Sequence, residues 1–321
     1  MRSIKTILGF LLTLMVLVLT TVVYVNQKID KVMDSRLKVG TTYMTMNNPF
    51  YQIINAEIEK VITEKGGTVY TRDPALNSQK QVEQIQYFID HSMDVIILNP
   101  VKSDDPATHR MVKKAEKSGI KVIVVDSQLS SSVKTTSTIV SDNYQAGVLL
   151  AENLLSKRDN ANILLLEHRD AVSGNQRIKG FVDRISKYAH YHIVGREESL
   201  GQTEVAMPAV ESFLNDSQPF DVVMALNDLA AIGAVAALDK HDVKESVLVY
   251  GIDGSPDMKS LLDTTDSVAA TVAQSPITMG HQAARLSLRA AKGKAVPSKV
   301  VVPVELITQK NIDRYDLKGW Q

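Results

Sequence analysis

The chain has 321 residues, a length that suggests two domains, each large enough to bury a core of its own. Its 36 basic and 36 acidic residues balance, so no excess of charge points to nucleic acid or an anionic surface as a partner. Cysteine is absent, which excludes disulfides, thiol catalysis, cysteine-ligated zinc and lipid attachment to a cysteine.

The first predicted element is the apolar segment Ile7–Val25, whose 19 residues carry no charge and follow Arg2 and Lys5. Its length approaches the ~20 residues that cross a bilayer as a helix. The apolar region of a signal peptide is shorter, roughly 7–15 residues, and ends at a small-residue cleavage site. No such site follows Val25. We expect an uncleaved membrane anchor and a polar stalk over residues 1–37; a cleaved signal peptide is the alternative.

Beyond this segment, short β-rich runs alternate with amphipathic helical patterns. Several of the runs are apolar throughout, as expected for parallel strands that helices cover on both faces. Repeated β-α-β units with right-handed crossovers build a doubly wound parallel sheet, which makes the expected class α/β. The strand candidates, in chain order, are Lys38–Thr45, Thr68–Thr71, Val95–Leu98, Lys121–Val125, Ile163–Glu167, His192–Glu197, Val222–Ala225, Val247–Tyr250 and Val268–Val272.

The series of β-α units restarts in the middle of the chain. One set of units lies between Lys38 and Val125, and a second set lies between Ile163 and Tyr250. So many strands exceed one doubly wound sheet of ordinary size. We therefore expect two similar lobes, with a ligand cleft between them that closes about a hinge.

Polar side chains follow the carboxyl ends of strand candidates in both halves of the chain. The turn after the first strand reads Asn47-Asn48-Pro49-Phe50-Tyr51, which places two amides and two rings at the start of a helix. Asn99, Asp126, Asn227-Asp228 and Asp253 likewise come directly after apolar runs. This edge of an open α/β sheet is where small polar ligands bind. Amides and carboxylates bond hydroxyl groups and a ring covers a C–H face, so the set suits a sugar.

Each of these residues has a structural alternative. An Asn or Asp at a strand end often caps the next helix or forms a turn, and Asn227 and Asp253 both fit that description. Neighbouring helical residues point ~100° apart, so we expect either Phe50 or Tyr51 to belong to the core. The recurrence of such residues at one sheet edge is what favours a ligand site.

An enzymatic alternative uses the same residues. Asp126 and Asp253 are a carboxylate pair of the kind that glycosidases use as acid and base. No G-x-S-x-G, no G-x-x-x-x-G-K-[ST] and no cysteine nucleophile supports turnover, however. His190 and His192 lack a third ligand for a metal. We expect a binding protein without catalytic residues, cofactor or metal, and keep a sugar-active enzyme on the same fold as the alternative.

Taken in order, the motifs resemble those of periplasmic sugar-binding proteins of the ribose- and galactose-binding type. This is the type I periplasmic-binding-protein fold, which the ligand core of the lactose-repressor family shares. The resemblance runs from Lys38 to Leu317. It is carried by Met46-Asn47-Asn48-Pro49-Phe50-Tyr51, Ile97-Leu98-Asn99-Pro100, Val124-Val125-Asp126-Ser127-Gln128, Val140-Ser141-Asp142-Asn143, Arg177-Ile178-Lys179-Gly180-Phe181, Ala225-Leu226-Asn227-Asp228, Gly251-Ile252-Asp253-Gly254 and Ala273-Gln274-Ser275-Pro276.

The resemblance implies two lobes joined by a three-segment hinge, with lobe 1 at residues 38–141 and 275–302 and lobe 2 at residues 142–274 and 303–321. It also implies the ligand contacts. Rings that pack on the sugar face are expected at Phe50 and Tyr51. Polar contacts are expected at Asn48, Asn99, Asp126, Ser141, Asn175, Arg177, Asn227, Asp253 and Gln274, although Arg177 has a bond to the lobe scaffold as its alternative.

Three positions depart from the pattern of ribose binders. Those proteins carry an Arg directly after the residue matching Asp126, where this chain has Ser127. A second Arg position maps to Asn175, and the second-lobe aromatic maps near Gly201. The scaffold for a sugar is retained while the set that selects ribose is broken, so no particular sugar is predicted.

The function that the resemblance implies is an extracytoplasmic receptor that closes around a monosaccharide or related polyol. Its partner would be a membrane protein, either an ABC permease or a sensor histidine kinase. A repressor is excluded because an apolar segment stands where a DNA-binding domain would precede the core. Transport is the commoner task of the fold, whereas an uncleaved anchor, which fixes the receptor beside a membrane partner, favours sensing. If the segment is cleaved, the receptor would be periplasmic or secreted.

Overall fold

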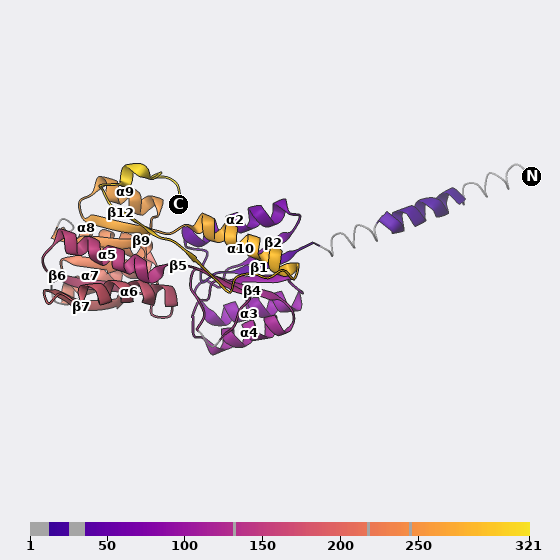
Figure 1. The fold of residues 1–321 in the computed structure, drawn as a ribbon, viewed down its shortest axis with the longest axis horizontal. Helices are drawn as coiled ribbons and strands as arrows, with labels where there is room; N and C mark the ends of the chain where they lie inside the picture. The colour runs from indigo at the N-terminus through magenta and orange to yellow at the C-terminus, as the bar shows by residue number, and fades with distance from the viewer. Residues whose placement is uncertain (1–12, 26–35, 131–132, 217–218, 244–245) are drawn as a thin grey trace, which may run out of the picture.

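The computed structural model of the chain describes residues 13–25, 36–130, 133–216, 219–243 and 246–321. It contains two lobes, each built on a six-stranded sheet with helices packed on its faces (Figure 1). The predicted α/β class with two parallel-sheet lobes is confirmed.

Lobe 1 contains six parallel strands in the order β11-β5-β4-β3-β1-β2. The strands are β1 (Lys38–Thr42), β2 (Thr68–Arg72), β3 (Val95–Leu98), β4 (Lys121–Val125), β5 (Ser137–Ser141) and β11 (Lys299–Val302). The helices are α2 (Pro49–Glu64), α3 (Ser78–Asp90), α4 (Pro106–Lys117) and α10 (Pro276–Ala291).

Lobe 2 repeats this plan in the order β12-β10-β9-β8-β6-β7, with β12 antiparallel to β10. Its strands are β6 (Ala161–Glu167), β7 (Tyr191–Glu198), β8 (Val222–Ala225), β9 (Leu248–Asp253), β10 (Val268–Ala273) and β12 (Glu305–Ile307). Its helices are α5 (Asn143–Lys157), α6 (Val172–Ile185), α7 (Thr203–Asp216), α8 (Asp228–Lys240), α9 (Pro256–Thr264) and the single turn η2 (Ile312–Arg314).

The chain passes between the sheets three times: after β5, after β10 and between β11 and β12. The sequence patterns did not predict β5, β11 or β12. β12 has three residues, β11 is an edge strand with exposed side chains, and β5 begins and ends with serine. Strands that are short, exposed or flanked by polar residues carry little of the apolar signal on which strand prediction depends. The exact lobe boundaries stay a prediction.

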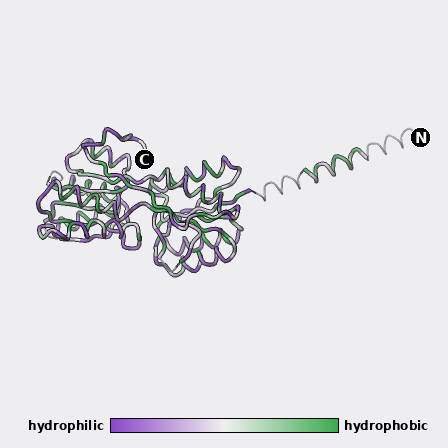
Figure 2. Tube along the Cα trace, in the orientation of Figure 1, coloured by the Kyte–Doolittle hydropathy of each residue, from purple (hydrophilic) through white to green (hydrophobic). Residues whose placement is uncertain are grey.

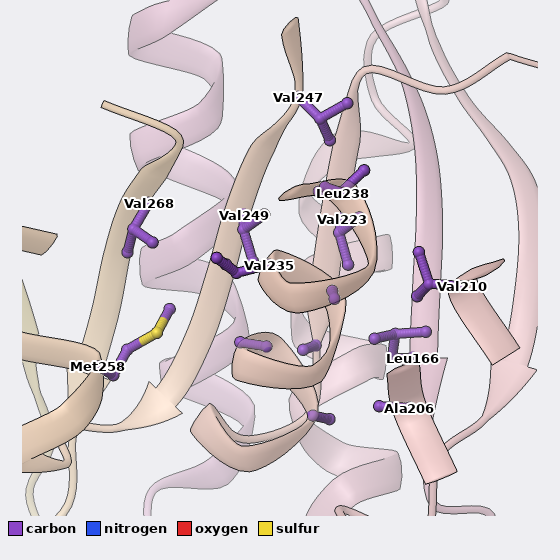
Figure 3. Packing of buried hydrophobic residues seen from close by; sticks show 14 of the residues in the cluster. Leu166, Ala206, Val210, Val223, Val235, Leu238, Val247, Val249, Met258 and Val268 are labelled. Atoms are coloured by element: carbon purple, nitrogen blue, oxygen red, sulfur yellow. The ribbon is translucent and has the colours of Figure 1, made fainter. Parts of the chain in front are cut away.

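The central strands supply two apolar cores because helices cover both faces of each sheet. Within β8, Val222 and Met224 join one cluster, whereas Val223 and Ala225 join the other. Figure 3 shows Val223 on the face that packs against Leu238 of α8. Successive side chains point to opposite faces of a strand, so a strand buried on both faces must be apolar throughout. This double burial explains the continuous apolar runs of the sequence.

The N-terminal segment stands apart from the lobes. Of the predicted anchor Ile7–Val25, residues 7–12 lie outside the described residues, and residues 13–25 form a helix. Its apolar side chains are exposed; Leu17, for example, retains 61% of its accessible surface. Figures 1 and 2 show this apolar helix away from both lobes. Among the residues that the structure describes, no helix has both the length and the apolar character needed to cross a bilayer.

Candidate ligand-binding site

A pocket lies between the lobes at the carboxyl ends of their strands, and residues of both lobes line it. Lobe 1 contributes Met44, Asn48, Phe50, Tyr51 and Asp126. Lobe 2 contributes His168, Ala171, Ser173, Arg177, Leu200, Gly201, Gln202, Leu226, Asn227 and Asp253, and Gln274 follows at the end of β10. Eight of the predicted contact residues are therefore brought together.

Arg177 of α6 is the buried cation of this pocket, with 3% of its surface exposed. Its Nε donates to Asn143 Oδ1 at 2.8 Å and its Nη1 donates to the carbonyl of Leu226 at 3.1 Å. Across the cleft, Nη2 lies 3.5 Å from Asp126 Oδ1 of lobe 1. Within lobe 2, Nη1 lies 3.8 Å from Asp253 Oδ1. Arg177 thus lines the pocket and is also bonded to its own lobe. Its position fits both expected roles, contact with ligand and a bond to the lobe scaffold.

The two pocket carboxylates are held by neighbouring donors. Tyr51 Oη donates to Asp126 Oδ2 at 3.1 Å, and Gln274 Nε2 donates to Asp253 Oδ1 at 2.6 Å. Burial raises the pKa of Asp126, and the charge of Arg177 opposes that rise. Burial and the nearby charge of Asp228 raise the pKa of Asp253 well above its usual range. Burial therefore destabilises the charged form of both carboxylates, and ligand hydroxyls that donate hydrogen bonds to them would stabilise it.

The backbone is strained at the same place. Asp126 has φ +61°, Leu200 has φ +51° and Asp253 has φ +153°, and all three residues line the pocket. Positive φ is unfavourable for residues with a Cβ, and such strain is concentrated at functional sites. Three of the seven described non-glycine residues with positive φ thus line this pocket, which favours it as the ligand site.

An aromatic group forms the lobe 1 wall. Phe50 and Tyr51 meet edge to face at 5.8 Å, and Tyr51 stacks on Tyr43 at 5.8 Å. The expectation was that one of the two rings belongs to the core; both rings do, and both also line the pocket. The described lining residues of lobe 2 include no Phe, Tyr or Trp, in keeping with Gly201 at the position matched to an aromatic.

The two asparagines at the strand ends serve as helix caps and as lining residues. Asn48 Oδ1 accepts from the N–H of Phe50 at 2.9 Å at the start of α2. Asn227 Oδ1 accepts from the N–H of Ala230 at 3.0 Å at the start of α8, and its Nδ2 donates to the carbonyl of Gly201 at 3.0 Å. The capping reading and the site reading are thus compatible.

Three predicted contacts lie elsewhere. Asn99 is buried behind the site, where its Nδ2 donates to Asp126 Oδ2 at 3.3 Å and so positions that carboxylate. Ser141 is buried at the end of β5 and does not line the pocket. Asn175 is exposed on α6, and its Nδ2 is bound to the carbonyl of Arg169 at 2.8 Å. The prediction that these residues contact ligand does not fit their positions. Asn175 lies two residues before Arg177, about 200° around the helix from the inward face that carries Arg177.

Sequence reasoning missed part of the lobe 2 wall, above all His168, Leu200 and Gln202. His168 comes directly after β6, so the same search for polar residues after strands could have found it. Burial lowers the pKa of its imidazole, which leaves it neutral with one donor and one acceptor nitrogen. Leu200 and Gln202 lie in the loop after β7, where no periodic pattern marks them.

The pocket contains an acceptor without a partner. Gln274 Oε1 is buried and has no hydrogen-bond partner among the described residues. Leaving such a group unpaired costs about 1–3 kcal/mol. A ligand hydroxyl is the kind of donor that would satisfy it. The described residues include no group of three or more side chains arranged to hold a metal ion.

Comparisons with known proteins agree with this architecture. A family model described as a periplasmic binding protein domain matches residues 39–295. The ribose import binding protein of Bacillus subtilis is 27% identical over 275 residues, covering 85% of this chain and 87% of that protein. The putative rhizopine-binding protein of Rhizobium meliloti is 25% identical over 290 residues, covering 88% of this chain and 93% of that protein.

Solved structures share the fold. An ABC transporter solute-binding protein of Bacillus halodurans with bound myo-inositol superposes with a TM-score of 0.80 at 23% identity, covering 87% of this chain and 97% of that chain. One from Agrobacterium vitis with bound D-fucose gives 0.80 at 25% identity, covering 86% and 97%. The curated relatives named here are binding proteins, so the expectation that the chain is not an enzyme is confirmed. The chain belongs to the periplasmic binding protein family, as its motifs indicated.

Proposed function

We propose that this protein is an extracytoplasmic receptor for a monosaccharide or a related polyol, which it presents in a closed form to an ABC importer. The observation that carries the proposal is the pocket between the lobes. It combines two buried carboxylates, a buried guanidinium, an unpaired amide oxygen and two rings. The relatives are named as import binding proteins for ribose and D-apiose and as a putative rhizopine-binding protein, which supports the ligand class.

Each part of the pocket has a role toward such a ligand. Hydroxyl groups would donate to Asp126 from lobe 1 and to Asp253 and Gln274 from the other side of the cleft. Arg177 would donate to a ring or hydroxyl oxygen, and the C–H face would lie on Phe50 and Tyr51. Because these groups come from both lobes, the ligand binds the closed form more tightly and shifts the population toward it.

The ligand class stays broader than ribose. The residue after Asp126 is Ser127, which is buried outside the pocket lining, and Asn175 faces solvent. Neither residue supplies the positive charge of the arginine that ribose binders carry at the matching position. The pocket keeps two carboxylates and the unpaired Gln274 Oε1 as acceptors, which suits a polyol rich in free hydroxyl groups.

A thermal-shift screen tests the proposal. The full chain, kept in detergent, is heated with ribose, apiose, allose, fucose, arabinose and myo-inositol in turn. A ligand that binds only the folded state stabilises it by about 2.7 kcal/mol at a concentration one hundred times its Kd. We expect at least one of these compounds to raise the melting temperature and to bind by calorimetry. If none of them does either, the proposed ligand class is wrong.

A second partner, a membrane sensor kinase, is favoured by one observation. The helix over residues 13–25 exposes apolar side chains around its whole surface. We propose that this segment is retained and tethers the receptor beside its partner. Intact-mass measurement of the membrane-extracted protein decides the point. A mass that includes Met1 is expected, and a mature start near Asn26 would show that the segment is cleaved.

A further inference from the structure

Helix α6 begins without a cap from its own lobe. The residue before its first turn is Ala171, whose side chain cannot accept a hydrogen bond. The first N–H groups of any helix lack partners within the helix and need an acceptor from elsewhere. Among the lobe 2 helices whose caps are described, α5, α8 and α9 obtain theirs from Asp142, Asn227 and Ser255 respectively. The start of α6 is therefore exceptional.

Two serines of lobe 1 provide the missing acceptors. The N–H of Val172 donates to Ser103 Oγ at 3.1 Å, and the N–H of Ser173 donates to Ser127 Oγ at 3.2 Å. The two hydroxyl groups lie 3.3 Å apart, within hydrogen-bonding distance of each other. Ser103 and Ser127 are 2% and 0% exposed, so water does not compete for these bonds in the closed form. One lobe thus caps a helix of the other.

Neighbouring contacts fix the same junction. The N–H of Ser103 donates to the carbonyl of Asp170 at 2.9 Å, immediately before α6. The carbonyl of Ser103 accepts from the N–H of Ser130 at 2.9 Å and lies 2.9 Å from His109 Nε2, which holds the Ser103 loop in place. The pair Lys102–Asp170, at 2.9 Å, also spans the lobes, but its side chains are nearly half exposed and solvent weakens it.

The capped helix carries a residue of the pocket. Arg177 lies on the second turn of α6 and reaches Asp126 of lobe 1. Farther along, Gly180 of α6 and Gly147 of α5 let the two helix backbones touch, so α6 moves with lobe 2. Capping the first turn of α6 from lobe 1 therefore sets the position of the pocket guanidinium as well as the distance between the lobes.

We propose that Ser103 and Ser127 form an interlobe latch that holds a population of this receptor closed before ligand arrives, with Arg177 already in place. Ser173 also lines the pocket, but both bonds of the latch join protein groups of the two lobes, so they need no ligand. A binding-competent form that is already populated raises the apparent affinity in proportion to its fraction. The position at which the sequence departs from the ribose pattern, Ser127, thus has a role in closure. Both serines are positioning residues that act through α6.

The absence of cysteine makes closure measurable without removing native thiols. The exposed residues Lys113 of lobe 1 and Lys187 of lobe 2 are replaced with cysteine and spin-labelled, and the distance between the labels is measured in sugar-free protein. We expect a short-distance population in the parent protein. The substitutions Ser103→Ala and Ser127→Ala together should transfer most of that population to longer distances.

Asn77→Ala is the matched control, because Asn77 caps α3 wholly within lobe 1 by accepting from the N–H of Lys80 at 2.9 Å. It removes a helix cap of similar strength and should leave the distance distribution unchanged. Ser127→Thr keeps the hydroxyl and should keep the short-distance population, which guards against a double variant that fails to fold. A sugar-free parent protein that is wholly open, or a folded double variant with unchanged distances, would overturn the latch.

Only the affinity readout rests on the proposed function. With the compound that gives the largest thermal shift, the double variant should bind about 3- to 10-fold more weakly by calorimetry. Affinity equal to that of the parent would contradict the role of the latch in binding. If no compound of the panel binds, the proposed ligand class fails, whereas the distances in sugar-free protein still decide whether the latch exists.

Discussion

Asp126 and Asp253 lie on opposite sides of one guanidinium, and each would accept hydroxyl groups of the ligand. We expect Asp126→Asn and Asp253→Asn each to weaken binding by about 2 kcal/mol or more, because a charged acceptor that pairs with buried hydroxyls is lost. Calorimetry with the best compound of the screen measures the change. Asp183→Asn, which alters an exposed carboxylate on α6, is the control and should bind normally. Unchanged affinity in both pocket variants would remove these residues from the site.

Asp228 gives the receptor a predictable pH dependence. It is buried beneath Asp253, and burial raises its pKa from the usual 3.8 to about 6, although Ser255 and Thr271 donate to it. An acid whose pKa is raised on folding stabilises the fold fully below its unfolded pKa, and that stability is lost as the pH rises through its folded pKa. The free energy of unfolding should therefore fall, on the order of 1–3 kcal/mol, as the pH rises from about 4 to above 6.

The variant Asp228→Asn isolates this effect. The amide of the variant makes the same hydrogen bonds at every pH, because it has no proton to release. Urea unfolding of the sugar-free protein at several pH values should give a shallower decline for the variant than for the parent protein. Parallel curves would show that Asp228 has an ordinary pKa in the fold.

Single residues of the site could be predicted where the rule of polar groups after strands applied. That rule found Asn48, Asp126, Asn227 and Asp253, whose neighbouring apolar runs define the strand ends. The rule predicted that Asn99 contacts ligand, whereas Asn99 lies behind Asp126 and donates to it. A position after a strand does not determine the direction of a short side chain. Which side of a helix faces a cleft likewise depends on how the helix packs, and the sequence pattern does not contain that information.

At the scale of elements, α5 and α6 form a close helix pair that depends on two glycines. A Cβ on Gly180 would lie 2.0 Å from the carbonyl oxygen of Tyr144, and one on Gly147 would lie 1.9 Å from that of Arg177. Both contacts are with backbone atoms, which cannot move away by a change of rotamer as a side chain can. This explains the glycine of the Arg177-Ile178-Lys179-Gly180-Phe181 motif in physical terms.

We expect Gly180→Ala to destabilise the fold by about 1–3 kcal/mol, since overpacking forces the helices apart. It should also weaken ligand binding, because α6 carries Arg177. Gln176→Ala on the same helix is the control and should change stability by less than about 0.5 kcal/mol. Thermal unfolding and calorimetry together check both effects. A Gly180→Ala protein with the stability of its parent would mean that the two helices are free to separate.

Strands with continuous apolar runs could be predicted from the sequence, because a strand that is buried on both faces must be apolar at every position. The strands that were missed, β5, β11 and β12, lie at or beside the segments that join the lobes. Their stability comes from pairing with a strand distant in the sequence, as β11 pairs with β5, and such pairing leaves no local signal. The interlobe cap of α6 was missed for the same reason, because Ser103 and Ser127 are distant in the sequence from the helix that they cap.

At the scale of the whole molecule, the C-terminal tail connects the lobes independently of the hinge. Tyr315 and Leu317 pack against a lobe 2 core, whereas Trp320 packs against the lobe 1 core. The buried Lys259 of α9 ties the tail to lobe 2 by donating to the carbonyls of Asp316 and Gly319. Figure 1 shows the C-terminus between the lobes, close to α10 and α2. The tail therefore spans the same gap that opens when a receptor of this kind releases its ligand.

The tail ends on a ring of the binding site. Trp320 meets Phe50 edge to face at 5.8 Å, and Phe50 lines the pocket. The chain contains one tryptophan, so its tryptophan fluorescence comes from this junction alone. We expect saturating ligand to shift the emission of the parent protein, because closure fixes the indole against Phe50.

Trp320→Ala should weaken ligand binding about 5-fold, since an aromatic pair contributes about 0.5–1.5 kcal/mol beyond its buried area and the closed form loses that pair. Trp320→Phe keeps a ring on Phe50 and should bind like the parent protein, which separates loss of the contact from loss of the fold. Calorimetry measures both variants, and fluorescence titration gives a second Kd for the parent. If emission stays constant at saturation and Trp320→Ala binds as tightly as its parent, the tail takes no part in closure, and the hinge segments and the α6 junction alone hold the lobes.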